Sequence, residues 1–320
     1  MATNLRNISW LHPLFSVRDW VMDKSGLFVL KAKCKQKLLF RQLIREDAEK
    51  KKQVELKLMQ MPANMISGSI NDDDIVISLT SYGKRVVDAL PYALYSLLTQ
   101  SLPPKKIVVY LDYDNWSDEK LPLILKRIQE IGVEFRYCED LKSYKKLIPA
   151  LQDFPNNPIV TVDDDFYYNP QYFEVMTNAY LASDKTTVLG QWGCIPEKRE
   201  GKYIPYSQWK DCKYATGDLP ISFFGCCCCY PPHIFDSEIL KKELFMKMCP
   251  TADDIWFWVM EERLGIKKAY IEPKGFGWNV SVNRIEEYDL SQSGTLMYQN
   301  VTNGKNDIQL RTLLDYYHLD

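Results

Sequence analysis

The most constraining feature of this sequence is an apolar, β-branched run that ends in three consecutive carboxylates. Ile159 to Val162 has the length and composition of a buried strand, and Asp163, Asp164 and Asp165 follow directly. In an open α/β sheet, ligands bind in the crevice outside the carboxyl ends of the strands. The run therefore predicts acidic side chains at a ligand-binding edge of a sheet.

The three carboxylates are expected to divide between two sides of the chain. Side chains alternate along a strand, which would put Asp163 and Asp165 on one side and Asp164 on the other. The outer pair could then share one Mn²⁺ or Mg²⁺, an ion that keeps its other positions for water and substrate phosphates. A solvated acidic turn and a Ca²⁺ loop are the alternatives, and we favour the metal-phosphate interpretation over both.

Length and composition limit the classes of protein to which this chain can belong. Its 320 residues allow one large domain with additions or two small ones, and a formal charge of −2 argues against a dedicated nucleic-acid binder. No apolar run is long enough to span a membrane and no secretory signal is evident, so we expect a cytoplasmic protein. The nine cysteines, four of them consecutive, are expected to be reduced thiols.

Residues 1–70 are predicted to form a basic N-terminal extension. From Lys24 to Lys57 there are eleven Lys or Arg residues against four Asp or Glu, interleaved with leucines, which is typical of a basic amphipathic helix. One interpretation is a peripheral contact with anionic lipid through residues 24–57. The other is a helix that packs on the body of the protein or on a partner subunit.

From Ile75 onward the sequence alternates between strand and helix patterns, which predicts βαβ crossovers and an α/β fold with a mostly parallel sheet. Strands are expected over 75–79, 106–111, 133–138, 159–162, 187–191 and 268–272. Helices are expected over 90–99, 119–131, 144–151, 172–182, 251–265 and 307–317. Residues 192–225 predict a long loop or a few irregular strands. We accordingly expect a catalytic domain over 71–274 and a C-terminal extension over 275–320.

Polar side chains follow several of these predicted strands. Because the carboxyl ends of parallel strands meet at one edge, these side chains are expected beside the three carboxylates. Acids and hydrogen-bond donors there suit the base and ribose of a nucleotide, and cations suit its diphosphate. With Asp163 and Asp164, the expected nucleotide-binding residues are Thr80, Ser81, Arg85, Asp112, Lys142, Lys145 and Lys146. The fingerprints of a P-loop and of a dinucleotide-binding fold are both missing from the sequence.

A second pair of acids, Asp253 and Asp254, follows Thr251, which is predicted to cap a helix that ends at Gly265. A carboxylate at a helix N-terminus is stabilised in its charged form, so it could act as a base that deprotonates an acceptor hydroxyl. The alternative is that both acids only cap the helix, and the local sequence alone favours it. Trp256 and Trp258 could pack in the core or offer a face to a sugar, and at least one is expected in the core.

The run from Cys226 to Cys229 contains a Cys-x-x-Cys pattern, with His233 downstream. A zinc site would need a second pair of ligands, and neighbouring cysteines on a strand point to opposite faces. We therefore expect small, buried strand residues here. His233 remains a minor candidate for a metal ligand.

Taken together, these segments resemble nucleotide-sugar-dependent glycosyltransferases of the GT-A fold, particularly bacterial family-2-like enzymes of surface polysaccharide assembly. The resemblance covers about residues 75–272 and is carried by 78–85, 140–150, Asp163 to Asp165 as an Asp-x-Asp motif, 230–232 and 252–256. It implies that Asp163 contacts the ribose or the metal and that Asp165 ligates Mn²⁺ or Mg²⁺. It also implies that Asp254 is the general base of an inverting displacement. The family's Glu-Asp pair is Asp-Asp here, so Asp253 stays open for that role.

The function implied by this resemblance is the transfer of a sugar from a nucleotide-sugar, with a UDP-sugar expected, to a hydroxyl of a polysaccharide or a lipid-linked oligosaccharide. A nucleotidyltransferase is one alternative, since it also binds a nucleotide and a metal on an α/β sheet. A non-catalytic scaffold that keeps the fold is the other. A glycoside hydrolase could use paired carboxylates too, but would need neither nucleotide nor metal.

Overall fold

A computed structural model describes residues 27–212, 222–223, 228–272, 279–283, 300 and 303–319. The chain divides into two compact units, residues 1–50 and 51–320. Helix α2 (Leu27–Gln60) begins in the first unit and ends in the second. The predicted division into 1–70, 71–274 and 275–320 remains a prediction. No helix among the described residues is long and apolar enough to cross a membrane.

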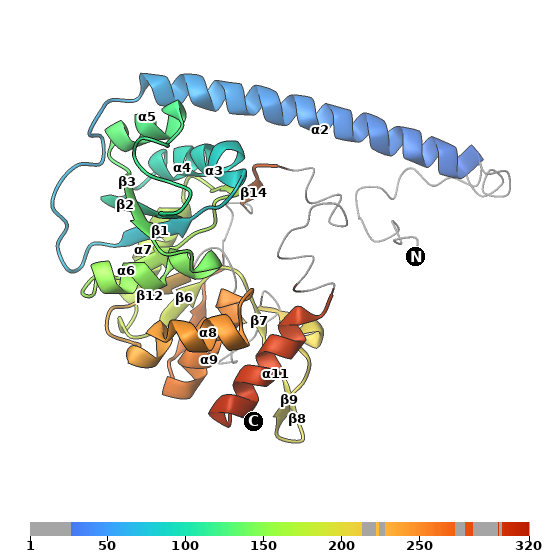
Figure 1. Ribbon diagram of the computed structural model, residues 1–320, viewed down its shortest axis with the longest axis vertical. Coiled ribbons are helices and arrows are strands. Elements are labelled where there is room, and N and C mark those ends of the chain that lie inside the picture. Colours follow the sequence, from blue (N-terminus) through green and yellow to red (C-terminus); the bar gives the residue numbers. More distant parts are fainter. Residues whose placement is uncertain are drawn as a thin grey trace. The chain divides into compact units, whose positions relative to one another are not determined.

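The second unit is built on a seven-stranded sheet with the strand order β13-β6-β12-β4-β1-β2-β3 (Figure 1). All neighbouring strands in it are parallel except β12, which is antiparallel to both β4 and β6. The predicted α/β fold with a mostly parallel sheet is confirmed. In chain order the strands are β1 (Val76–Thr80), β2 (Lys106–Asp112), β3 (Glu134–Cys138), β4 (Ile159–Thr161), β6 (Val188–Gly190), β12 (Cys228–Tyr230) and β13 (Lys268–Tyr270).

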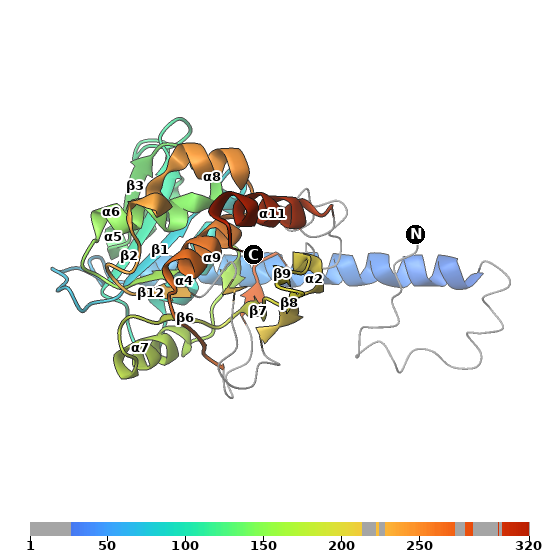
Figure 2. The ribbon, with the colours of Figure 1, turned by 90° about the horizontal axis from the view of Figure 1, so that it is seen from below.

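Helices cover both faces of this sheet, because side chains alternate along each strand and both faces are apolar. In β1, Ile77 and Leu79 belong to the core on one face and Val76 to the core on the other. The first face carries α3 (Arg85–Asp88), α4 (Leu90–Leu98), α5 (Leu123–Ile131) and α7 (Tyr172–Ala182). The second carries the 3₁₀ helix η3 (Lys142–Lys146), α6 (Ile148–Asp153), α8 (Lys242–Met248), α9 (Asp253–Leu264) and α11 (Lys305–Tyr317) (Figure 2).

The region predicted as a long loop or irregular strands, residues 192–225, contains short antiparallel strands in its described part. Strand β7 (Gly193–Ile195) pairs with both β10 (Lys210–Asp211) and β11 (Ser222–Phe223). Strands β8 (Lys198–Arg199) and β9 (Lys202–Tyr203) form a separate pair. On either side of this region in the sequence, the short strands β5 (Phe166–Tyr167) and β14 (Val280–Ser281) pair with each other. The remaining short elements are the 3₁₀ helices η4 (Tyr206–Gln208) and η6 (Ser237–Leu240).

The predicted N-cap of the acidic helix was wrong by one residue. Helix α9 begins at Asp253 with Ala252 as its N-cap residue, and no side chain caps it. The hydroxyl of Thr251 instead lies 2.7 Å from Oδ1 of Asn300 and 3.1 Å from Oε1 of Gln309, so it joins α9 to the chain around α11. The predicted end is confirmed, because Gly265 adopts the left-handed conformation with φ 63°.

Both candidate aromatic residues of α9 lie in the core. Trp256 and Trp258 are fully buried, so the hypothesis that either presents a face to a sugar is wrong. Cys228 and Cys229 are buried in β12, as predicted for small strand residues. Cys226 and Cys227 lie outside the described residues.

Glu261, in the last turn of α9, gives the fold a predicted dependence on pH. Its side chain is 2% exposed, and its Oε2 lies 3.7 Å from Nζ of Lys268. Burial raises the pKa of Glu261 from 4.5 to about 7, although Lys268 acts in the opposite direction. Because its folded-state pKa is raised, Glu261 makes a contribution to stability that is fully present below pH 4.5 and is lost as the pH rises through 7. We expect Glu261→Gln to be more stable than the wild type at pH 8, by about 3 kcal/mol in its free energy of unfolding.

Urea unfolding of both proteins at pH 5 and pH 8 measures this difference. Glu262→Gln is the matched control, because Glu262 lies beside the same lysine, 2.8 Å from its Nζ, but is only partly buried. That variant is expected to gain nothing at pH 8, since it loses the charge and one of the two oxygens that accept hydrogen bonds from Lys268 and Tyr203. A stability difference between Glu261→Gln and the wild type that is the same at both pH values would contradict the assignment.

Candidate active site

The carboxyl ends of β1, β2, β3 and β4 lie at one edge of the sheet, because these strands are parallel. Strand β4 ends at Thr161, and Asp164 and Asp165 lie in a turn. The predicted alternation of the three carboxylates therefore does not apply, since it requires a continuing strand. Their directions are set by the cations that surround them.

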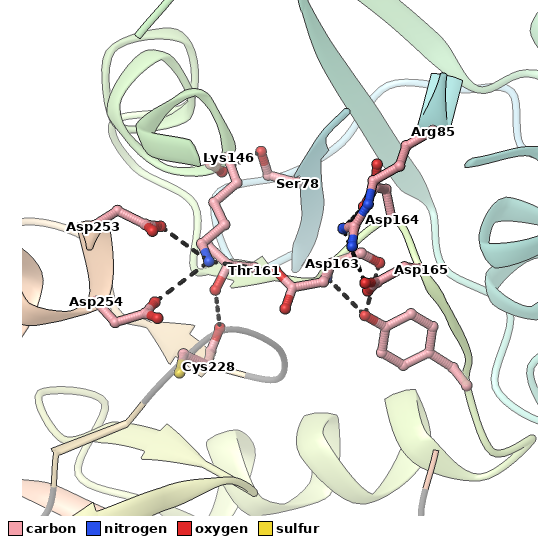
Figure 3. Close-up of polar contacts among 11 residues, drawn as sticks. Ser78, Arg85, Lys146, Thr161, Asp163, Asp164, Asp165, Cys228, Asp253 and Asp254 are labelled. Carbon is pink, nitrogen blue, oxygen red and sulfur yellow. Dashed lines mark hydrogen bonds and ion pairs between the residues drawn. The ribbon is translucent and has the colours of Figure 1, made fainter. Parts of the chain in front are cut away.

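Arg85 binds two of these carboxylates with the same nitrogen atom. Its Nη1 lies 3.2 Å from Oδ1 of Asp164 and 2.9 Å from Oδ2 of Asp165 (Figure 3). The hydroxyl of Ser81 donates a further hydrogen bond to Asp164, which is 5% exposed. Burial raises the pKa of Asp164, and the charge of Arg85 opposes that effect. The loop after β1 thus holds the acidic turn after β4 in place.

Two further residues hold the main chain of the acidic turn. The hydroxyl of Tyr168 lies 2.7 Å from the amide nitrogen of Asp163 and 2.9 Å from its carbonyl oxygen. The amide of Val282 donates a hydrogen bond of 2.7 Å to the carbonyl oxygen of Asp165. These hydrogen bonds hold the main chain at Asp163 and at Asp165, so the carboxylates project from a turn whose backbone is held at both ends.

Lys146 connects the acidic turn with the start of α9. Its Nζ lies 3.4 Å from Asp163, 3.0 Å from Asp253 and 3.4 Å from Asp254 (Figure 3). Its side chain is buried, and the hydroxyl of Ser78 donates a hydrogen bond of 2.6 Å to its carbonyl oxygen. Burial lowers the pKa of Lys146, but the three carboxylates outweigh that effect and hold it well above its usual value. Two acidic motifs almost a hundred residues apart therefore meet at one ammonium group.

Burial distinguishes the two acids at the start of α9. The side chain of Asp253 is 6% exposed and that of Asp254 is 29% exposed, close to the exposure of Asp163. A group that takes a proton from a substrate must be accessible to it. Asp254 meets this requirement and Asp253 does not.

The predicted nucleotide-binding residues at β1, β2 and β3 already have structural contacts. The hydroxyl of Thr80 donates to the carbonyl oxygen of Tyr110 at 2.8 Å, and Asp112 accepts hydrogen bonds from Asn115. Lys142 and Lys145 both bind Asp140, and Lys145 is buried. Of these side chains, that of Lys142 is the most accessible to a ligand, at 55% exposed.

His233 does not join this site. Strand β12 runs antiparallel to β4, with Cys228 opposite Thr161 and Tyr230 opposite Ile159. The residues that follow Tyr230 therefore lie at the other edge of the sheet, away from the carboxylates. His233 is therefore remote from Asp163 and Asp165, and its role as a metal ligand remains a prediction.

Sequence reasoning missed several residues that shape the site. Tyr168 fixes the main chain of Asp163, while Asn300 and Gln309 hold Thr251, two residues before α9. Side-chain contacts over such separations leave no local pattern in the sequence. Tyr168 lies only five residues from Asp163, but an aromatic residue after an acidic turn does not by itself predict a hydrogen bond to the main chain of that turn.

The donor atoms at this edge fit a hard divalent cation. The described residues contain no group of three or more His, Cys, Asp or Glu side chains that could hold a metal ion. However, Mg²⁺ and Mn²⁺ commonly bind one or two carboxylates and complete their shell with water and phosphate oxygens. Asp163 and Asp165 are partly exposed, and each lies beside a cationic side chain, so this turn already accommodates positive charge.

No family model matches this sequence, and a search of curated proteins found no match. Solved structures with a similar fold include glucosyl-3-phosphoglycerate synthase from Mycobacterium tuberculosis in complex with Mn²⁺, UDP and glucosyl-3-phosphoglycerate. That similarity has 12% identity, covers 78% of this chain and 81% of that chain, and has a TM-score of 0.45. A second similar structure contains residues 1–349 of TarS from S. aureus in complex with UDP. The match has 15% identity, covers 63% of this chain and 59% of that chain, and has a TM-score of 0.40.

A third similar structure is CMP:2-keto-3-deoxy-manno-octonic acid synthetase in complex with CTP. It has 13% identity, covers 69% of this chain and 98% of that chain, and has a TM-score of 0.42. These similarities are too distant to carry an argument about the reaction of this protein. Its function has to be argued from the site itself.

Proposed function

We propose that this protein is a metal-dependent glycosyltransferase that moves a sugar from a nucleotide-sugar, with a UDP-sugar as the expected donor, to a hydroxyl of a polysaccharide or lipid-linked oligosaccharide. The transfer is proposed to invert the configuration of the sugar. The observation that supports this most directly is the contact of Lys146 with Asp163 on one side and Asp254 on the other. Through this contact, a carboxylate that could bind a cation lies close to a carboxylate that could act as a base.

An accessible base favours transfer to a hydroxyl over nucleotidyl transfer to an ionised phosphate or carboxylate. A phosphate or carboxylate nucleophile is already ionised at neutral pH, so it needs no proton acceptor. An alcohol does need one as it attacks, and a general base contributes roughly 10²- to 10⁴-fold to the rate. The acids at the start of α9 would also repel an anionic nucleophile. Both arguments favour a neutral hydroxyl acceptor near Asp254.

The proposed roles of the residues follow from their positions. Asp163 and Asp165 would hold Mn²⁺ or Mg²⁺, which supplies charge neutralisation for a departing diphosphate. Asp254 would take the proton of the acceptor hydroxyl. At the same time the hydroxyl oxygen would bond to the anomeric carbon of the donor sugar, and the bond between that carbon and the diphosphate would break. Lys146 would hold Asp254 and Asp163 at a fixed separation. Lys142 would contribute positive charge at the nucleotide end of the crevice.

Peripheral contact with anionic lipid is part of the same proposal, because a lipid-linked acceptor would be presented at a membrane surface. Within α2, residues 31–45 contain six Lys or Arg and no Asp or Glu. Leu38 and Ile44 are 63% and 54% exposed. A helix that combines positive charge with exposed apolar side chains suits an anionic membrane surface.

The proposed donor site predicts stabilisation by a nucleoside diphosphate that depends on metal. We expect one of ADP, CDP, GDP, UDP and dTDP to raise the melting temperature in Mn²⁺ and not in chelator. At 100 times its dissociation constant the ligand should stabilise by about 2.7 kcal/mol. Thermal unfolding with each nucleotide measures this, and Asp165→Ala should abolish the effect.

The matched control is Asp184→Ala, because Asp184 precedes β6 and therefore lies at the opposite edge of the sheet. That variant should keep the nucleotide effect. If no nucleotide stabilises the wild type, the transferase proposal is wrong and a non-catalytic scaffold becomes the better interpretation. Incubation with a nucleotide-sugar and, separately, with a nucleoside triphosphate then distinguishes the reactions, since only nucleotidyl transfer releases pyrophosphate.

A further inference from the structure

Arg85 neutralises a carboxylate that the proposed donor site needs for its metal. Its Nη1 lies 2.9 Å from Oδ2 of Asp165, and the side chains of Arg85 and Asp165 are 23% and 21% exposed. A divalent cation bound by Asp165 would lie beside the guanidinium, and like charges a few ångströms apart repel strongly in a partly buried site. Arg85 and the cation therefore compete for Asp165.

The neighbouring carboxylate provides Arg85 with a second partner. Asp164 is more deeply buried than Asp165, and a hydrogen bond from Ser81 holds it. Because Tyr168 and Val282 fix the main chain of the turn, Asp165 can exchange one cation for another without a change in the backbone. Only the Arg85 side chain has to rotate.

We propose that Arg85 is an exchangeable counter-ion, which neutralises Asp165 until a divalent cation replaces it and then binds the diphosphate of the donor. The second part rests on the proposed function, and the first part does not. A guanidinium suits this exchange because its planar fork binds carboxylate and phosphate oxygens with similar geometry. Asp164 remains a partner for the guanidinium when Asp165 binds the cation, because its Oδ1 already lies 3.2 Å from Nη1.

This exchange makes the binding of cation and diphosphate cooperative. A cation at Asp165 frees Arg85 for the diphosphate, and a diphosphate that attracts Arg85 frees Asp165 for the cation. The two ligands must therefore raise each other's affinity by the same factor. Removal of the guanidinium should strengthen the binding of the cation alone and weaken that of the diphosphate.

The test is a titration of Mn²⁺ without nucleotide, in which electron paramagnetic resonance measures the free ion. We expect Arg85→Gln to bind Mn²⁺ about tenfold more tightly than the wild type, equivalent to about 1.4 kcal/mol. Arg85→Lys keeps the charge and should remain close to the wild type. Lys84→Gln is the matched control, because it removes one positive charge from the same loop at an exposed residue. Thermal unfolding of each variant confirms that it is folded.

Opposite changes for the two ligands separate this proposal from a purely structural role for Arg85. A structural defect would weaken both Mn²⁺ and nucleoside diphosphate, whereas exchange strengthens the first and weakens the second. Mn²⁺ binding by Arg85→Gln that is no tighter than that of Lys84→Gln would overturn the inference. Arg85→Gln could bind Mn²⁺ more tightly while neither it nor the wild type binds a nucleotide. That result would support the exchange at Asp165 and refute the donor site, so failure of this inference can be distinguished from failure of the proposed function.

Discussion

Replacement of Asp254 by Asn is expected to lower kcat by ~10²- to 10⁴-fold, the contribution of a general base. Asparagine has almost the same shape but cannot accept the proton of the acceptor hydroxyl. The side chain of Asp254 is 29% exposed and its carboxylate lies 3.4 Å from Nζ of Lys146, so a side chain of nearly the same shape fits the same space. Initial rates of nucleoside diphosphate release with acceptor present measure the loss, and affinity for the nucleotide with Mn²⁺ should be retained.

Asp253→Asn is the matched control, since it makes the same chemical change one residue away. Asp253 is buried and lies 3.0 Å from Nζ of Lys146, so this variant should lose stability while it keeps most of its kcat. The assignment of the base would be wrong if Asp254→Asn kept more than a tenth of the wild-type kcat. It would be reversed in favour of Asp253 if Asp253→Asn were folded and much slower than Asp254→Asn.

The sequence was sufficient to place the acidic turn at the carboxyl edge of the sheet, because that placement depends only on local patterns. The strand before Asp163 is short, β-branched and buried, and the helices between strands are long enough for parallel crossovers. The same logic correctly placed Arg85 and Lys146 near the carboxylates. Arg85 begins the short helix that follows β1, and Lys146 ends the 3₁₀ helix that follows β3, so both come shortly after a parallel strand.

The sequence was not sufficient to predict how these side chains pair. Alternation along a strand predicted Asp164 on the opposite side from Asp165, but both contact Nη1 of Arg85 because the strand has already ended. Neighbouring acids also look equivalent in a sequence. Their burial, which distinguishes Asp253 from Asp254, depends on how α9 packs against residues far away in the chain.

The direction of β12 was the other feature that local patterns could not supply. A short apolar run such as Cys228 to Tyr230 predicts a buried strand in either direction, and only its partners decide between them. Since β12 is antiparallel to β4, His233 lies at the opposite edge from the carboxylates. The contact of Thr251 with Asn300 and Gln309 is equally non-local, and it replaced the helix cap that the sequence predicted.

Replacement of Lys146 by Met is expected to lower the free energy of unfolding by about 3 to 5 kcal/mol, the cost of removing one partner from a buried ionic cluster. Methionine keeps most of the volume and the apolar stem but removes the ammonium. Asp163, Asp253 and Asp254 would then face one another without the charge that they share. Chemical denaturation of both proteins at pH 7 measures the difference.

Lys142→Met provides the matched control, because Lys142 lies in the same 3₁₀ helix and also pairs with a carboxylate. Its side chain is 55% exposed, so its pair with Asp140 should contribute no more than about 1 kcal/mol. A stability loss in Lys146→Met no larger than that of the control would show that the three carboxylates do not depend on Lys146. The structural link between the acidic turn and α9, on which the position of Asp254 beside the donor site depends, would then have to be sought in other contacts.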